Sequence, residues 1–229
     1  MKINEIFYSI EGEGIRAGHP CVFIRTFGCN LNCSYCDSQY ACKGDNYKEM
    51  SIVDILDEVK KYNTRYVTIT GGEPLIQDEE EMSSLIMCLL SYNYYVNIET
   101  NGAADLAYYK EIRWNEIPNI CEGQLIFTMD WKSDSCGMSK FMNKDNLSCL
   151  ARCDVLKFVV GSEQDLIQMK ELLQSDEYLY SRVNIFVSPV FGEIDPKYIV
   201  DFLKQNGLDK VRLQLQIHKF IWDPNERGV

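Results

Sequence analysis

The chain has little positive charge and no long apolar run. Its 229 residues carry 23 Lys and Arg against 34 Asp and Glu, which gives a formal net charge of -11. Such a balance argues against a broad basic surface for nucleic acid or anionic lipid. No stretch approaches the roughly 18 consecutive apolar residues of a transmembrane helix, and residues 1–5 do not begin the apolar segment of a signal peptide. We therefore expect no direct nucleic-acid partner, no membrane contact, a small-molecule substrate and a cytoplasmic location.

Cysteine, by contrast, is abundant. Ten cysteines in a chain expected to fold in a reducing compartment favour metal ligands and buried thiols over disulfides. Three of them, Cys29, Cys33 and Cys36, follow the apolar run 21–27 at CxxxCxxC spacing. An ordinary [4Fe-4S] cluster takes four thiolates, so three leave one iron with an open position where a reactant can bind. This spacing predicts a reactive cluster, with a zinc site or buried structural cysteines as the alternatives.

The seven further cysteines show no second tight spacing, and a buried or incidental thiol is the default interpretation for each. Four of them, Cys121, Cys136, Cys149 and Cys153, lie within a 33-residue stretch. These four could together bind an accessory metal, which stays open as an alternative.

Apolar segments alternate with amphipathic ones along the chain. The expected strands are 21–27, 66–70, 94–99, 125–129, 156–160, 183–187 and 211–216, and the expected helices are 51–62, 79–92, 163–174 and 196–205. Because such alternation favours a parallel sheet, we predict the α/β class, with a partial or distorted (β/α) barrel of about six to seven largely parallel strands. We also expect a single domain over residues 1–229, with irregular insertions around 103–124 and 132–153.

Polar motifs follow the expected strands. In chain order they are Cys29, 71–74 (Gly-Gly-Glu-Pro), 99–102 (Glu-Thr-Asn-Gly), 130–132 (Asp-Trp-Lys), 161–162 (Gly-Ser), 188–189 (Ser-Pro) and His218. The carboxyl ends of parallel strands share one edge, and ligands bind at that edge in such folds. We therefore expect these motifs to converge on one site.

The CxxxCxxC motif resembles the signature of the radical S-adenosylmethionine enzymes, and 71–74 resembles their GGEP-type motif. The resemblance implies a [4Fe-4S] cluster on Cys29, Cys33 and Cys36, with S-adenosylmethionine on the open iron. The cofactor carries the radical, so no side chain is expected to be catalytic beyond supporting roles. The glycine backbone and the Glu73 carboxylate would hold the methionyl amine. The residues that the resemblance assigns to S-adenosylmethionine are Tyr35, Cys36, Asp37, Gly72, Glu73, Glu99, Asp130, Trp131, Lys132 and Ser188.

Segments near both ends of the chain narrow the resemblance. Residues 7–14, 18–20, 36–38 and 216–229 together are similar to the 7-carboxy-7-deazaguanine synthase family, whereas 103–153 matches loosely. That family rearranges 6-carboxy-5,6,7,8-tetrahydropterin to 7-carboxy-7-deazaguanine with loss of ammonia, in the deazapurine pathway to queuosine. The resemblance further implies a flavodoxin or ferredoxin as electron donor and a homodimer.

The same resemblance implies sites for a magnesium ion and for the substrate. Ser38 matches the position whose hydroxyl binds Mg²⁺, where many members have threonine. Arg25 and His218 would support catalysis by receiving the substrate carboxylate, although Arg25 and Glu13 could simply form a surface ion pair. Glu11 stands where many members have glutamine. The residues assigned to the substrate are Glu11, Gly12, Glu13, Arg25, Thr70, His218 and Val229, the last through a chain-terminal carboxylate.

Two other functions stay open on the sequence alone. A glycyl-radical-activating enzyme would share the CxxxCxxC core but would need an open face for a protein loop. A zinc-binding interaction module would need a fourth ligand and no segment like 71–74. The first alternative keeps the radical chemistry and changes the substrate, whereas the second removes catalysis.

Overall fold

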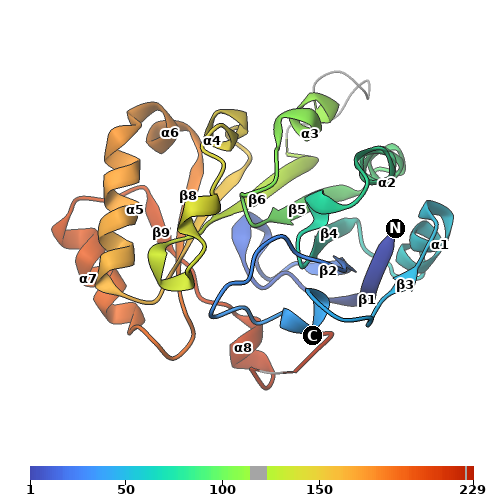
Figure 1. The fold of residues 1–229 in the computed structure, drawn as a ribbon, viewed down its shortest axis with the longest axis horizontal. Helices are drawn as coiled ribbons and strands as arrows, with labels where there is room; N and C mark the ends of the chain where they lie inside the picture. The colour runs from blue at the N-terminus through green and yellow to red at the C-terminus, as the bar shows by residue number, and fades with distance from the viewer. Residues whose placement is uncertain (114–122, 225) are drawn as a thin grey trace.

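The computed structural model describes residues 1–113, 123–224 and 226–229. Within these ranges nine strands form one sheet, in the order β3-β1-β2-β4-β5-β6-β7-β8-β9 (Figure 1). From β2 onward the strands lie in chain order, as in a barrel built from repeated strand–helix units. The strands are β1 (Lys2–Ile10), β2 (Pro20–Thr26), β3 (Lys48–Glu49), β4 (Tyr66–Gly71), β5 (Tyr95–Thr100), β6 (Leu125–Trp131), β7 (Val155–Val160), β8 (Asn184–Pro189) and β9 (Val211–Leu213).

Seven strands, β2 and β4 to β9, run parallel to one another. The predicted α/β class with a partial barrel is therefore confirmed. The other two strands lie outside the predicted set, because β1 mixes polar with apolar residues that are mostly half-buried and β3 has only two residues. β1 pairs antiparallel with β2, and β3 pairs antiparallel with β1.

The longer helices lie on the outside of the sheet (Figure 1). The helices are α1 (Ile52–Val59), α2 (Glu79–Ser91), α3 (Ala107–Glu111), α4 (Asn146–Cys149), α5 (Glu163–Ser175), α6 (Glu177–Arg182), α7 (Pro196–Gln205) and α8 (His218–Ile221). α1 and α5 begin with reciprocal capping boxes, Ser51 with Asp54 and Ser162 with Asp165. None of the helices in the described ranges is long and apolar enough to cross a membrane.

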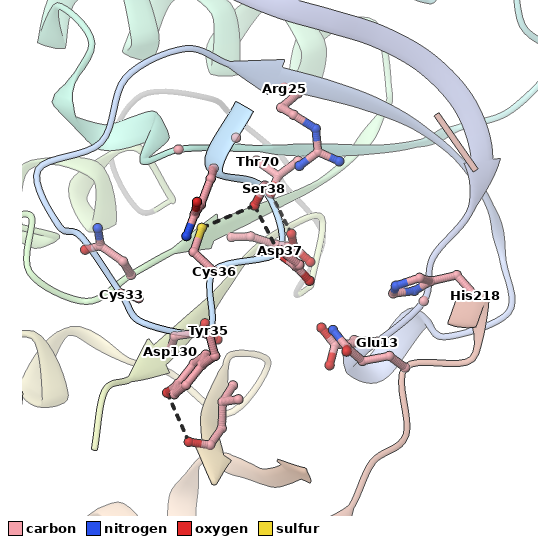
Figure 2. A pocket seen from close by; sticks show the side chains of 18 of the residues that line it. Glu13, Arg25, Cys33, Tyr35, Cys36, Asp37, Ser38, Thr70, Asp130 and His218 are labelled. Atoms are coloured by element: carbon pink, nitrogen blue, oxygen red, sulfur yellow. Dashed lines mark hydrogen bonds between the residues drawn. The ribbon is translucent and has the colours of Figure 1, made fainter. Parts of the chain in front are cut away.

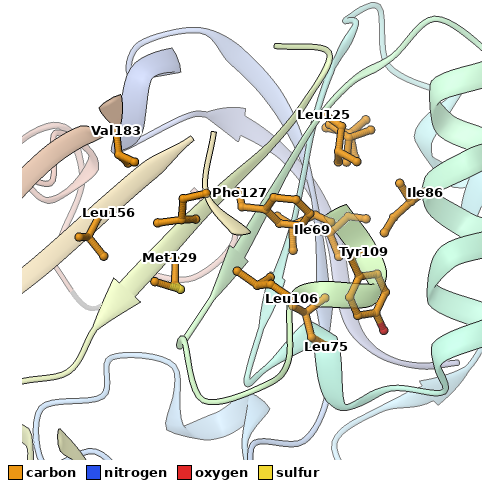
Figure 3. Close-up of a cluster of buried hydrophobic side chains, with 14 of the residues drawn as sticks. Ile69, Leu75, Ile86, Leu106, Tyr109, Leu125, Phe127, Met129, Leu156 and Val183 are labelled. Atoms are coloured by element: carbon orange, nitrogen blue, oxygen red, sulfur yellow. The ribbon is translucent and has the colours of Figure 1, made fainter. Parts of the chain in front are cut away.

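Each parallel strand has an apolar face and a polar face, because side chains alternate across a strand. In β4, Val67 and Ile69 belong to the buried hydrophobic cluster, whereas Thr70 faces the barrel interior. In β7, Phe158 joins the same cluster and Lys157 faces the interior. The apolar faces pack beneath the helices and form the core (Figure 3). The opposite faces are left to build a site.

The expected insertions contain short helices. The side chain of Asn146, at the start of α4, ties the two insertions together. Its Nδ2 donates to the carbonyls of Gly102 at 3.1 Å and Ala104 at 2.6 Å, and its Oδ1 accepts from the Leu106 N–H at 3.0 Å. Part of the first insertion, including Cys121, lies outside the described residues.

Candidate functional site

A cavity of about 1000 Å³ opens on the polar face of the sheet. Its size is sufficient for more than one small ligand. Figure 2 shows Arg25, Ser38 and Thr70 on one side of this cavity and Glu13 with His218 on another. The motifs expected to converge therefore do so in large part. The predicted site residues that line the cavity are Glu11, Gly12, Glu13, Arg25, Cys29, Cys33, Tyr35, Cys36, Asp37, Ser38, Thr70, Gly72, Glu99, Asp130, Lys132, His218 and Val229.

Glu73 does not line the cavity, contrary to the prediction. Its carboxylate is fully buried and accepts hydrogen bonds from the N–H groups of Asn101 (2.6 Å) and Leu75 (3.0 Å) and from the Thr100 hydroxyl (2.8 Å). Burial raises the pKa of Glu73 to about 7 against these bonds. The carboxylate thus joins the turn after β4 to the end of β5. The backbone of Gly72 faces the cavity instead.

Trp131 and Ser188 also lie off the cavity wall. Asp130 faces the cavity, so the alternation along β6 turns the next residue, Trp131, toward the hydrophobic core. Ser188 is buried behind Glu13 and donates a hydrogen bond from Oγ to Glu13 Oε1 at 3.3 Å. Its influence on the cavity is exerted through Glu13.

Cys29, Cys33 and Cys36 lie on the loop after β2, and all three line the cavity. Hydrogen bonding from Cys42 lowers the pKa of Cys29 and of Cys36 to about 6, against the effect of burial. The Asn101 amide also donates to the Cys29 sulfur, at 3.7 Å. The hydrogen bond with Cys136, together with burial, instead raises the pKa of Cys33. Thiolates are the form that binds iron, so two of the three thiols are poised to bind it and Cys33 would lose its proton on binding; three sulfur donors on one loop fit an iron–sulfur cluster.

Two cysteines outside the motif reach this loop. Cys42 also lines the cavity, and Cys136 hydrogen-bonds the Cys33 thiol while its carbonyl accepts from the Ser34 N–H at 3.2 Å. Within the described ranges, no three His, Cys, Asp or Glu side chains are gathered as a preformed metal site. The motif thiols would therefore turn toward a common point on binding a cluster, and such coupling of metal binding to local structure is usual.

The accessory site suggested by the later cysteines finds no support among the described residues. Cys136 packs beside Cys33, whereas Cys149 donates to the Asp145 carbonyl at 3.7 Å and Cys153 approaches Asp154 at 3.9 Å. These three thiols have different neighbours. Cys121 lies outside the described residues, so its part in the hypothesis stays a prediction.

The floor of the cavity is the segment 11–13, at the end of the barrel opposite the thiol loop. Because β1 runs antiparallel to β2, the segment after Ile10 crosses the amino ends of the parallel strands. Gln214 anchors this segment: its Oε1 accepts from the Gly14 N–H at 2.8 Å and its Nε2 donates to the Gly14 carbonyl at 3.2 Å. Gln214 directly follows Leu213, where β9 ends. The strand is therefore shorter than the predicted strand 211–216.

His218 packs directly on Gly12. A Cβ built on Gly12 would lie 2.2 Å from His218 Nδ1, so a side chain there would displace the imidazole. The Ile217 N–H donates to the Gly12 carbonyl at 3.2 Å. Burial lowers the pKa of His218 despite the nearby carboxylate of Glu13. His218 is therefore neutral near pH 7 and offers an N–H donor or a lone pair instead of a charge.

Lys157 is the main cavity residue that the sequence analysis missed. It lies opposite Asp130 in the β6–β7 register, and its Nζ is 3.1 Å from Asp130 Oδ1 and 2.9 Å from Glu13 Oε2. Lys132 Nζ donates to Asp130 Oδ2 at 2.7 Å. Burial alone would raise the pKa of Asp130, but the two ammonium groups hold it below its ordinary value. The available signal was a lysine inside the apolar run 155–160, since a buried charge needs a partner.

Comparisons of the sequence with known proteins identify the family of this chain. Residues 23–117 match the model of the Radical SAM superfamily. Over its full length the chain is 44% identical to a 7-carboxy-7-deazaguanine synthase of Clostridium acetobutylicum, of which 99% is covered. It is 37% identical to one of Methanospirillum hungatei, over 98% of this chain and 86% of that protein. The chain belongs to the 7-carboxy-7-deazaguanine synthase family. It is a radical S-adenosylmethionine enzyme.

A solved structure supports the fold of this family member. The crystal structure of QueE from Escherichia coli superposes with a TM-score of 0.70, covering 94% of this chain and 93% of that one at 23% identity. Membership of the radical S-adenosylmethionine superfamily implies S-adenosylmethionine and an iron–sulfur cluster. The thiol loop after β2 is the place whose chemistry fits that cluster.

Arg25 and Glu99 flank Thr70 in this 7-carboxy-7-deazaguanine synthase family member. Arg25 Nε donates to Glu5 Oε1 at 2.8 Å, and the Thr70 hydroxyl donates to Glu99 Oε2 at 2.7 Å. Since Arg25 pairs with Glu5, the suggested ion pair between Arg25 and Glu13 is wrong. Burial raises the pKa of Glu99, although the charge of Lys157 opposes the rise.

Glu11 stands where many members of the family have glutamine, and its surroundings favour the protonated form of its carboxyl group. The side chain is buried, with 2% of its surface exposed, and it accepts a hydrogen bond from the Thr68 hydroxyl. Burial, reinforced by the charges of Glu99 and Glu13, raises the pKa of Glu11 to about 8, against the hydrogen bond from Thr68 and the charge of Arg16. At neutral pH its carboxyl group is thus largely protonated and resembles the amide of glutamine in charge and shape.

We expect Glu11→Gln to change how stability depends on pH. The folded chain keeps the Glu11 proton up to about pH 8, whereas the unfolded chain releases it near the ordinary value of 4.5. Between these values, the wild-type free energy of unfolding should fall relative to the variant as pH rises, by up to about 1.4 kcal/mol per pH unit. Thermal unfolding midpoints at a series of pH values check this. Two parallel curves would contradict the protonated state.

Proposed function

We propose that the chain rearranges 6-carboxy-5,6,7,8-tetrahydropterin to 7-carboxy-7-deazaguanine with loss of ammonia, in queuosine or another 7-deazapurine pathway. The observation that carries the proposal is one cavity in which the thiol loop faces a floor of acidic and hydrogen-bonding residues. The relatives of the same name, matched over nearly the whole chain, support it. A glycyl-radical-activating enzyme would need an open face, whereas this cavity is closed on one side by the segment that packs on His218.

Cys29, Cys33 and Cys36 would hold a [4Fe-4S] cluster, leaving one iron for S-adenosylmethionine. When bound, this pair supplies the 5′-deoxyadenosyl radical that removes a hydrogen atom from the substrate. The protein's part is to place the reactants and exclude water. The residues proposed to orient S-adenosylmethionine from the cavity wall are Tyr35, Cys36, Asp37, Gly72, Glu99, Asp130 and Lys132.

The substrate carries a carboxylate at one end and a donor-rich pyrimidinone at the other. Arg25 would bind the carboxylate from one side of the cavity, and neutral His218 would offer it an N–H from another. Glu13 is an acceptor for the donor edge, and Thr70 and the Gly12 backbone add polar contacts. The protonated carboxyl group of Glu11 would donate one hydrogen bond and accept another. Val229 lines the same cavity and completes the proposed set.

Ser38 is the proposed Mg²⁺ ligand. Its hydroxyl donates a hydrogen bond to Asp37 Oδ1 at 3.1 Å. Two oxygen atoms that could bind a metal ion therefore lie together beside the thiol loop. Magnesium prefers oxygen ligands and keeps several waters, and one hydroxyl plus substrate oxygens would suffice. The pair therefore fits a hard cation at the cavity wall.

We expect Ser38→Ala to weaken the magnesium dependence of turnover, because the variant loses an oxygen ligand. Ser38→Thr is the matched control and should respond to magnesium as the wild type does, since it keeps the hydroxyl. Initial rates over a series of Mg²⁺ concentrations distinguish the three proteins. An unchanged magnesium response in the alanine variant would count against Ser38 as a ligand.

The direct test of the function is turnover. Anaerobically purified protein, loaded with iron and sulfide and given dithionite, S-adenosylmethionine and Mg²⁺, should convert the carboxylated tetrahydropterin to 7-carboxy-7-deazaguanine and ammonia. Mass spectrometry of the products measures both. Cleavage of S-adenosylmethionine with no deazaguanine product would overturn the assignment.

We further propose that the chain acts as a single domain and as a homodimer in the cytoplasm, with a flavodoxin or ferredoxin as electron donor. The continuous sheet and the hydrophobic cluster that the described residues form beneath its helices support the first point. All nine described cysteines are free thiols, as expected in a reducing compartment. The dimer and the electron donor rest on the family resemblance.

A further inference from the structure

Lys157 stands at the centre of the cavity charges. It lies in the middle of β7, and only 7% of its surface is exposed. Its single ammonium group contacts two carboxylates from distant segments, Glu13 at 2.9 Å and Asp130 at 3.1 Å. Figure 2 shows Asp130 near the thiol loop and Glu13 near His218. One cation therefore spans the two parts of the cavity.

The charges around Lys157 make its ammonium group necessary. Burial by itself would lower the pKa of Lys157, but the carboxylates of Asp130, Glu13 and Glu99 hold it well above its ordinary value. Without the ammonium group, Glu13 would keep only the Ser188 hydroxyl at 3.3 Å as a described partner. Buried carboxylates that lose their cation either take up a proton or move apart.

The two contacted carboxylates serve different ligands in the function proposed above. Glu13 lies on the floor segment assigned to the substrate, and Asp130 lies beside Lys132 in the segment assigned to S-adenosylmethionine. We propose that Lys157 is a positioning residue that holds Glu13 and Asp130 as a pair and thereby couples the binding of the heterocyclic substrate to the binding of S-adenosylmethionine. This inference rests on the proposed function.

A physical argument supports coupling through one shared ammonium group. A ligand that engages Glu13 fixes that carboxylate and, through the 2.9 Å contact, the ammonium group of Lys157. Asp130, 3.1 Å from the same ammonium, is then already held in place when the second ligand binds, so less ordering remains to oppose its binding. The reverse holds for a ligand that engages Asp130. Coupling between two binding equilibria is reciprocal, so each ligand should change the affinity of the other by the same factor.

Binding measurements on the cluster-loaded protein test the proposal. The dissociation constant of S-adenosylmethionine is measured by anaerobic titration calorimetry with and without the carboxylated tetrahydropterin, and then with the two roles exchanged. In the wild type each ligand should tighten the other about fivefold or more. In Lys157→Met both affinities should fall and the coupling factor should approach one. Lys157→Arg keeps the charge and should retain part of the coupling.

Lys197→Met is the matched control. Lys197 also forms an ion pair with a carboxylate, Asp201 at 2.7 Å, but its side chain is 79% exposed on α7. This control should bind both ligands as the wild type does. Iron content, measured for every variant, separates a loss of coupling from a loss of the cluster.

A second pair of variants keeps the proposal testable if Lys157→Met fails to fold. Glu13→Gln should weaken S-adenosylmethionine as well as the substrate, and Asp130→Asn should weaken the substrate as well as S-adenosylmethionine. If each variant affects only its own ligand, or if Lys157→Met keeps the wild-type coupling factor, Lys157 does not couple the sites. If the wild type does not bind the tetrahydropterin, the proposed function fails, and the coupling fails with it.

Discussion

Alanine at Cys29, Cys33 or Cys36 is expected to abolish turnover and the brown colour of an iron–sulfur protein. Each thiolate would hold one iron and the fourth iron already lacks a protein ligand, so the loss of one thiolate leaves a second iron unheld. We expect activity to fall to background in each single variant. Iron and sulfide content, together with the visible absorption spectrum of anaerobically purified protein, measure the loss independently of activity.

Two other cysteines are the controls for this experiment. Cys88→Ala changes a thiol on α2, away from the cavity lining, and should leave both iron content and turnover unchanged. Cys42→Ala should also keep the cluster, because Cys42 lies outside the motif. However, it removes the hydrogen bonds that lower the pKa of Cys29 and Cys36, so the variant should take up iron more slowly near pH 7. A triple alanine variant of the motif that still held four irons would refute the assignment.

Gly72→Ala is expected to have the next largest effect. A Cβ on Gly72 would lie 2.1 Å from the carbonyl oxygen of Gly28 and 3.0 Å from the Cβ of Cys29. The first contact is with backbone, which cannot rotate away, so the thiol loop must shift. A misplacement of about 1 Å at a reacting centre can cost about a hundredfold in rate. We expect a loss of this size in kcat/KM, together with weaker binding of S-adenosylmethionine.

Gly207→Ala separates this effect from the general cost of replacing glycine. Gly207 follows α7 with a φ of 64°, and a Cβ there would meet nothing within 4 Å. The variant should lose about 1–2 kcal/mol of stability from backbone strain alone and keep its turnover. If the Gly72 variant turns over substrate as well as the Gly207 variant does, close approach of the two loops is not needed.

The parallel part of the fold was predictable because its signal is local. Runs such as 66–70 and 156–160 are apolar on one face and lie between helical segments, so both their type and their direction follow from pattern. β1 was harder to predict: its nine residues are held by pairing with β2, and most of them stay partly exposed. Its antiparallel direction, which brings Glu11 to the floor, depends on that distant pairing.

The site was predictable where motifs follow strands and unpredictable where partners come from elsewhere. Cys29 and Asp130 are found from spacing and strand ends. Lys157 and Cys136 gain their importance from neighbours that only the folded chain supplies. Glu73 is the opposite case. Its motif predicted a contact with the ligand, but its carboxylate stabilises the turn that carries the motif.

The Gly14–Gln214 contact has a consequence for how the chain is made. Its two residues are separated by 200 positions, and the hydrogen bonds between them are buried. During synthesis, β2 and the thiol loop leave the ribosome well before Gln214, the anchor of the floor, which emerges 200 positions after Gly14. Contacts between such distant positions form late, because closing a long loop costs entropy before the contact repays it. A nascent chain can therefore expose its thiols to iron and to oxidants well before it has a closed place to hold a substrate.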